Sequence, residues 1–186
     1  SDVCCSDIVI SSFRSLTERM GFRCMLNDQG VEVFFENEEK KFGKEEYELQ
    51  INPYQITISA SHYSGYFYSL VSLLQLREVY NDSVPCGEIR DIPRFSWRGQ
   101  HLDCARHYYE VESILRLLDL MAFLKLNRFH WHLIDDESFR LELPSFPKLA
   151  ERTGLRGDGY LIPGVFGGVK VLEGGTYSGF GRAAVR

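Results

Sequence analysis

The sequence contains no run of about 18 apolar residues, the length that a helix needs to cross a membrane, so no spanning segment is expected. It opens SDVCCSD, without an initiator methionine or the apolar core of a signal peptide, which predicts a mature or cut product. Internal repeats and low-complexity segments are also lacking. For 186 residues, 44% of them hydrophobic, these absences favour one or two compact globular units.

A net positive charge and a recognisable cysteine spacing are both lacking. The net charge is -5, and the lysines and arginines are scattered, so nucleic acid is not an expected partner, whereas a neutral sugar is compatible. The five cysteines are an odd number and show no CxxC or metal-type spacing, which leaves the redox compartment open. Cys104 lies inside a predicted strand and is expected to be a small buried side chain.

The first part of the chain alternates between helical and extended patterns. The expected elements are a helix over 6–21, a hairpin over 23–36, strands over 47–51 and 55–60, and a helix over 63–76. Alternating apolar residues in the two later strands mark one buried face. Helices against a mainly antiparallel sheet form an α+β layer, so residues 1–80 are predicted to be a domain of this kind.

A change of pattern follows at residues 81–93, NDSVPCGEIRDIP, which contain Pro and Gly and lack a helical period. They are predicted to be a linker to a second domain over 94–186. That domain opens with a strand over 100–104, a helix over 111–126 ended by Asn127, and a strand over 128–134. Strand, helix and strand with short breaks form a βαβ unit, whose strands are parallel.

The helix of this unit has a wide apolar face and a narrower polar stripe. The apolar positions are Val111, Ile114, Leu115, Leu118, Met121 and Ala122, and the polar ones are Glu112, Arg116 and Asp119. Further along, residues 154–175 are rich in glycine and are predicted to be a long loop, and a further helix is expected to start at residues 176–178.

Charged residues follow both strands of the βαβ unit. Arg106 comes after the first strand, and Asp135 and Asp136 come after the second. Ligands of parallel α/β proteins bind at the carboxyl ends of strands, where a guanidinium offers donors to hydroxyl or carboxylate oxygens. The pattern is equally compatible with a structural pair between Arg106 and Asp135 that stabilises the two loops.

Two further kinds of site receive less support. His130 and His132 alternate on a strand and, with Asp135, mimic a metal-ligand set. A zinc site needs tetrahedral geometry and supporting partners, and hydrogen-bonded positions are the more usual outcome, so no metal and no cofactor is expected. A nucleophile elbow, Gly-x-Ser-x-Gly, does not occur.

The stretch DCARHYYEVESILRLLDLMAFLKLNRFHWHLIDDESFRLELPSFPKL resembles the opening of the catalytic barrel in the β-N-acetylhexosaminidases, the family-20 glycoside hydrolases. The motifs are Asp-x-x-Arg-His at 103–107 and His-Trp-His-Leu-x-Asp-Asp at 130–136. Residues 46–49 and 65–76 are similar, more weakly, to the small domain before that barrel, with Ser69 in place of a glycine. The resemblance implies an α/β chain: an α+β domain, then the opening βαβ of a TIM (β/α)8 barrel, incomplete because a barrel takes roughly 250 residues.

What the resemblance implies for function is exo-acting hydrolysis of terminal β-linked GlcNAc or GalNAc by substrate-assisted retaining catalysis. Arg106 would bind hydroxyls of the terminal sugar, and Asp135 would support a later histidine, with Asp136 and His132 as further supporting residues. The family's catalytic Asp-Glu pair belongs to a His-x-Gly-Gly-Asp-Glu motif, which is absent here. This chain alone is therefore expected to be inactive.

The expected partner is a glycan or glycoconjugate with a terminal N-acetylhexosamine. The resemblance favours a secreted, periplasmic or lysosomal compartment. An alternative stays open at this point, namely a catalytically dead sugar-binding or scaffolding protein that retains the barrel opening. The sequence makes no prediction about the oligomeric state.

Overall fold

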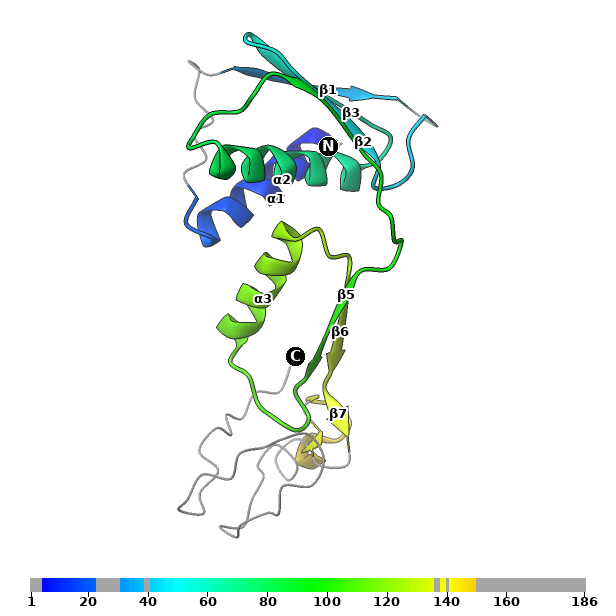
Figure 1. The fold of residues 1–186 in the computed structure, drawn as a ribbon. Helices are drawn as coiled ribbons and strands as arrows, with labels where there is room; N and C mark the ends of the chain where they lie inside the picture. The colour runs from blue at the N-terminus through cyan, green and yellow to red at the C-terminus, as the bar shows by residue number, and fades with distance from the viewer. Residues whose placement is uncertain (1–4, 23–30, 39–40, 136–137, 140, 150–186) are drawn as a thin grey trace. The chain divides into compact units, whose positions relative to one another are not determined.

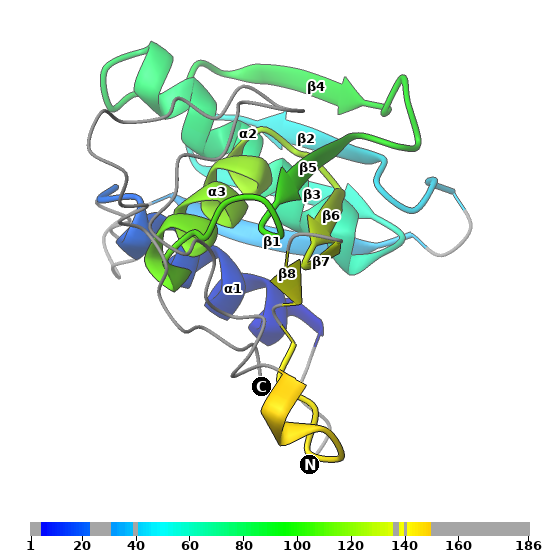
Figure 2. The ribbon, with the colours of Figure 1, turned by 90° about the horizontal axis from the view of Figure 1, so that it is seen from below.

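The computed structural model of the protein describes residues 5–22, 31–38, 41–135, 138–139 and 141–149. The chain divides into two compact units, the first made of residues 1–98 and 121–126 and the second of residues 99–120 and 127–186. Most of their elements are labelled in Figure 1, and all of them are labelled in Figure 2. Across the described ranges, every helix is too short or too polar to span a bilayer.

The first unit is a mixed sheet with two helices on one face (Figure 1). Its elements are α1 (Cys5–Arg19), β1 (Glu32–Asn37), β2 (Tyr47–Ile51), β3 (Gln55–Ala60), α2 (Tyr63–Val79) and β4 (Gly87–Asp91). The strand order is β1-β3-β2-β4, as Figure 2 shows. The β1–β3 pairing is parallel and the other two pairings are antiparallel, which confirms the predicted mainly antiparallel sheet.

The core of this unit lies between the sheet and the helices. Alternation along β2 and β3 buries Tyr47, Leu49 and Ile58 on the helix-facing side, as predicted. Helix α2 lies very close to the sheet at Gly65, because a Cβ atom there would lie 2.6 Å from the carbonyl oxygen of Glu46, the residue before β2. The sequence therefore needs glycine at this point in α2.

Two expectations for the first unit change. Strand β4 pairs with β2 from Tyr47↔Asp91 to Ile51↔Gly87, which corrects the prediction of a linker over 81–93 at these positions. An outer strand needs only backbone hydrogen bonds from one neighbour, so its sequence need not alternate strongly. For the predicted hairpin, residues 23–30 lie outside the described residues, and the described partner of β1 is β3.

The second unit contains a parallel strand pair. Its elements are β5 (Gly99–Asp103), α3 (Val111–Phe123), β6 (Arg128–His132), β7 (Ile134–Asp135) and β8 (Ser138–Phe139). The parallel register of β5 and β6 runs from Gly99↔Arg128 to Asp103↔His132, which confirms the predicted βαβ connection. The β7–β8 pair is a short antiparallel ladder.

The end of α3 differs from the prediction that Asn127 terminates it. The helix ends at Phe123, and the amide of Leu126 donates to the Met121 carbonyl while the amide of Lys125 donates to that of Ala122. This is a Schellman cap with Lys125, at φ 56°, in the left-handed position that glycine or asparagine usually takes.

A side-chain network explains a lysine at this position. The segment 121–126 belongs to the first unit, and Lys125 Nζ donates to Tyr47 OH at 2.7 Å, Ser72 Oγ at 2.6 Å and Asp91 Oδ2 at 2.7 Å. Burial raises the pKa of Tyr47. Burial also acts to raise the pKa of Asp91, but the hydrogen bonds from Lys125 and Tyr47 outweigh it and lower that pKa.

The exposure of α3 follows the predicted faces only in part. Ile114 and Met121 are buried as expected, but Val111 is 54% exposed and Leu115 49% exposed. Asp119, from the predicted polar stripe, is only 8% exposed. The apolar face is wide, and the described part of the second unit offers one parallel pair of strands, which is too narrow to cover such a face.

Candidate functional site

The candidate site lies at the carboxyl ends of β5 and β6. These strands are parallel and their last residues, Asp103 and His132, are register partners, so both strands end at the same edge. Arg106 follows β5 by three residues, and Asp135 ends β7 directly after β6. The strand-end rule therefore brings together the side chains that the sequence singled out.

The Arg106 guanidinium joins two carboxylates. Its Nη1 donates to Asp103 Oδ2 at 2.9 Å, and its Nη2 forms an ion pair with Asp135 Oδ2 at 2.8 Å. The Arg106 side chain keeps 34% of its surface exposed. The structural pair between Arg106 and Asp135 is thus present, and the two carboxylates fix the guanidinium at the end of the strands.

Asp103 shapes the loop that carries Arg106. Its Oδ1 accepts the amides of Ala105 at 3.0 Å and Arg106 at 3.1 Å, which is an Asx turn. Burial alone would raise the pKa of Asp103, but hydrogen bonds from the Arg106 amide and guanidinium, with the Arg106 charge, hold it below the usual value. Asp103 was absent from the predicted site residues, although the Asp-x-x-Arg spacing carried the signal.

His132 shares the Asp135 carboxylate with Arg106. The Nε2 atom of His132 lies 2.7 Å from Asp135 Oδ2 and 3.3 Å from Arg106 Nη1. Because a guanidinium nitrogen only donates, the carboxylate is the acceptor when Nε2 carries a proton. Nδ1 is then the atom of the neutral ring with a free lone pair. Among the described residues, the histidine that contacts Asp135 is therefore His132, whereas the family resemblance implied a later histidine.

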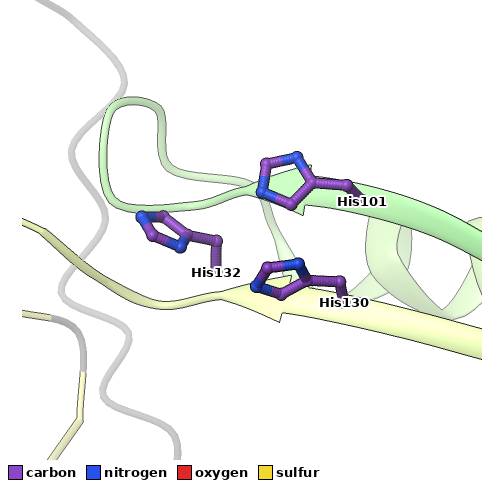
Figure 3. A group of neighbouring side chains, drawn as sticks. All are labelled: His101, His130 and His132. Carbon is purple, nitrogen blue, oxygen red and sulfur yellow. The ribbon is translucent and has the colours of Figure 1, made fainter.

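Three histidines gather on the same face. His101 and His130 are register partners with ring centroids 4.6 Å apart, and the His132 ring lies 5.7 Å and 5.9 Å from them, respectively (Figure 3). One ring nitrogen of each lies within 4.8 Å of the others. The metal-ligand set weighed from the sequence was His130, His132 and Asp135. In the structure, the third member beside His130 and His132 is His101.

Other predicted positions contribute less or fall outside the described residues. Cys104 is buried, as predicted, and its Sγ accepts the indole N–H of Trp131 at 3.1 Å. His107 is exposed and its ring lies 4.8 Å from that of Tyr109. Asp136, the predicted loop over 154–175 and the predicted helix from 176 lie outside the described residues.

Comparisons with known proteins match both parts of the chain to one family. The family model described as glycosyl hydrolase family 20, domain 2, matches residues 11–92, and that described as glycosyl hydrolase family 20, catalytic domain, matches residues 95–171. A beta-hexosaminidase of Vibrio furnissii is 37% identical over 134 residues, which are 71% of this chain and 22% of that protein. Beta-hexosaminidase subunit alpha of Rattus norvegicus is 41% identical over 113 residues, 58% of this chain and 21% of that protein.

Solved structures agree with these matches. A GH20 exo beta-N-acetylglucosaminidase from Vibrio harveyi, in complex with N-acetylglucosamine, aligns with a TM-score of 0.69 and 34% identity over 82% of this chain. A Streptomyces plicatus N-acetyl-beta-hexosaminidase aligns with a TM-score of 0.66 and 30% identity over 83% of this chain. The chain covers 24% and 33% of these two structures, and about a fifth of the two curated relatives.

Proposed function

The chain belongs to glycosyl hydrolase family 20, and we propose that it supplies domain 2 and the opening of the catalytic (β/α)8 barrel of an exo-acting β-N-acetylhexosaminidase. The proposed substrate is a glycan or glycoconjugate with terminal β-linked GlcNAc or GalNAc. The parallel β5–α3–β6 connection supports the barrel assignment, since a barrel repeats this unit. We place the domain boundary after β4, between the two family matches.

The proposed reaction is substrate-assisted hydrolysis with retention, in which the acetamido oxygen of the sugar is the nucleophile. The family's Asp-Glu pair, within His-x-Gly-Gly-Asp-Glu, would orient that acetamido group and protonate the leaving oxygen. The motif does not occur in this sequence, so activity is proposed only for a protein that also carries it. The 186-residue chain by itself is expected to show no turnover.

The observation that carries a sugar-binding role is the fixed guanidinium of Arg106 at the shared strand end. Asp103 and Asp135 each hold one of its terminal nitrogens, so a neutral sugar would meet a pre-oriented donor. Hydroxyl oxygens accept hydrogen bonds, and a charged donor makes them strong. We assign Asp135 a positioning role, together with His132 and the neighbouring Asp136.

The test uses a protein that joins this chain to the rest of a family-20 catalytic domain. Arg106→Ala should raise KM and lower kcat/KM for a chromogenic N-acetylglucosaminide by about tenfold to hundredfold, since a hydrogen bond to a charged group contributes about 1.5–3 kcal/mol. Asp135→Asn should lower kcat more than it changes KM, because a positioning residue does not bind the sugar. Arg116→Ala, an exposed arginine on α3, is the matched control.

Melting temperatures separate the two roles that the sequence left open. A purely structural Arg106 would lower the melting temperature and leave the KM of the folded protein unchanged, and that result would refute sugar binding. A protein that binds N-acetylglucosamine yet shows no turnover, with the Asp-Glu motif present, would instead favour the alternative of a catalytically dead sugar-binding protein.

A further inference from the structure

We propose that His101, His130 and His132 form a binding site for a divalent transition metal of the zinc class. The site lies on the face of the β5–β6 pair from which these three side chains project, next to Arg106. It does not rest on the proposed hydrolase activity, because nothing in its argument involves a sugar or a glycosidic bond. The inference changes the expectation from the sequence, which placed no metal here.

The backbone fixes the relative positions of the three rings. His130 and His132 are two residues apart on β6, so their side chains point to the same face, and the register sets His101 directly opposite His130. In Figure 3 the rings of His101 and His130 both reach toward the ring of His132. The arrangement is a His-x-His pair on one strand completed by a histidine on the next.

The spacing of the ring nitrogens is close to that of a metal site. One nitrogen of each ring lies within 4.8 Å of the others. A tetrahedral zinc with bonds of about 2.0–2.1 Å holds its ligand atoms about 3.3 Å apart, so binding requires each ring to move inward by roughly 1 Å. His101 and His130 are exposed, and rotation of their side chains supplies that movement without a change in the strands.

The partner of His132 is an independent observation in favour of ligation. A histidine that binds a metal usually donates its other ring N–H to a carboxylate, which fixes the tautomer and raises the basicity of the ligand nitrogen. Asp135 Oδ2 lies 2.7 Å from Nε2 of His132 and provides that partner. Nδ1 is then the ligand atom, and Asp135 positions it.

The donor set selects the class of metal. Imidazole nitrogens suit zinc, copper, nickel and iron, whereas calcium and magnesium prefer oxygen ligands. Three imidazoles leave a fourth position of a tetrahedron open for water or for an oxygen of another ligand. The two carboxylates beside His132, Asp103 and Asp135, outnumber the one guanidinium of Arg106, so the local charge favours a cation.

The experiment titrates the 186-residue chain with Co²⁺, whose visible spectrum reports the coordination geometry, and then displaces it with Zn²⁺. Cysteines 4, 5, 24 and 86 are replaced by serine so that their thiols do not compete, and the buried Cys104 is kept. We expect one tetrahedral Co²⁺ per chain. His101→Asn and His130→Asn should each abolish that spectrum, and Asp135→Asn should weaken binding by about tenfold or more while the tetrahedral spectrum persists.

The matched control is His107→Asn, an exposed histidine outside the cluster, which should bind Co²⁺ as the background chain does. Circular dichroism and amide exchange in β5 and β6 check that each variant is folded. The proposal is overturned if the folded His101 and His130 variants retain the tetrahedral spectrum, or if His107→Asn loses it equally. The readout is metal binding, so a negative result would not bear on the proposed hydrolase function. A protein without hydrolase activity would likewise not bear on the proposed metal site.

Discussion

In the first unit, two helices and a four-stranded sheet enclose a continuous core, whereas in the described part of the second unit much apolar surface stays exposed. Fully buried side chains of the first unit include Val9, Leu16, Tyr47, Leu49, Ile58 and Val71. The buried apolar side chains in the described part of the second unit are Cys104, Ala105 and Ile114. The first unit is therefore stabilised by its own packing, while local order in the second depends more on the β5–β6 ladder and the contacts of Arg106.

Lys125 in the first unit and Arg106 in the second are each held by several acidic or polar groups, and the two arrangements have different expected roles. The three ammonium protons of Lys125 meet three acceptors, on β2, α2 and β4, so the lysine ties elements of the first unit together. Arg106 instead joins Asp103 and Asp135 at the ends of strands, where ligands of parallel α/β proteins bind. The Lys125 arrangement is expected to matter for stability, whereas the Arg106 arrangement is expected to matter for function as well as for local order.

The largest expected effect tests the difference between the cores. Leu49→Ala removes a side chain that is 0% exposed and should destabilise the first unit by about 2–5 kcal/mol, because it leaves a cavity. Leu115→Ala is the matched substitution on the exposed face of α3 and should change stability by no more than about 0.5 kcal/mol. Hydrogen exchange of the amides of β2 and β3, followed against denaturant, measures the first unit separately.

If Leu115→Ala destabilised the chain as much as Leu49→Ala does, the contrast between a buried core in the first unit and an exposed α3 face would be wrong. Such a result would mean that the α3 face is covered in solution. Analytical ultracentrifugation of the unmodified chain then distinguishes coverage by a second copy from coverage within the chain.

A middle-sized effect concerns Lys125. Lys125→Met keeps the length of the side chain and removes its hydrogen bonds, which should cost about 1–3 kcal/mol because partly buried acceptors lose a charged donor. Lys125→Gly loses the same bonds but relieves the left-handed backbone, whose penalty is roughly 1–2 kcal/mol for a residue with a Cβ atom. The glycine variant should therefore unfold at higher denaturant than the methionine variant. The opposite order would show that the lysine conformation carries no strain.

Strong local patterns made much of the fold predictable from the sequence. The strands over 47–51 and 55–60 have the predicted bounds because their apolar residues alternate on one buried face. Strand β4 was missed because an exposed outer strand shows little alternation. The end of α3 was misplaced because the cap residue Lys125 is chosen by contacts with β2 and β4, which no local rule contains.

The candidate site also contains residues that local sequence patterns predicted and one that depends on contacts between distant parts of the chain. The position of Arg106 and Asp135 after two parallel strands was enough to expect them at one edge, and they lie within contact distance. His101 was missed because its place opposite His130 depends on the register between strands that are 29 residues apart in the chain. Spacing along a single strand, which suggested His130 and His132, contains no information about that register.

The smallest expected effect is the response of each unit to acid. Interactions with Lys125 and Tyr47 lower the pKa of Asp91, and interactions with Arg106 lower that of Asp103, in both cases against the opposing effect of burial. A carboxyl whose pKa is lower in the folded state stabilises the fold above its unfolded pKa of about 3.9, and this contribution is lost as the pH falls through the folded value. Asp91→Asn should therefore reduce the gain in stability of the first unit between strongly acidic and neutral pH, and Asp103→Asn should do so for the second. Each difference should stay below about 1 kcal/mol, because partly exposed ion pairs contribute little.

Amide exchange in β2 and in β5, measured across this pH range, reports the two units in one sample, so each variant serves as the control for the other. If Asp103→Asn altered the acid response of β2 as much as that of β5, the two networks would not be independent, and the division into separately stabilised units would be wrong.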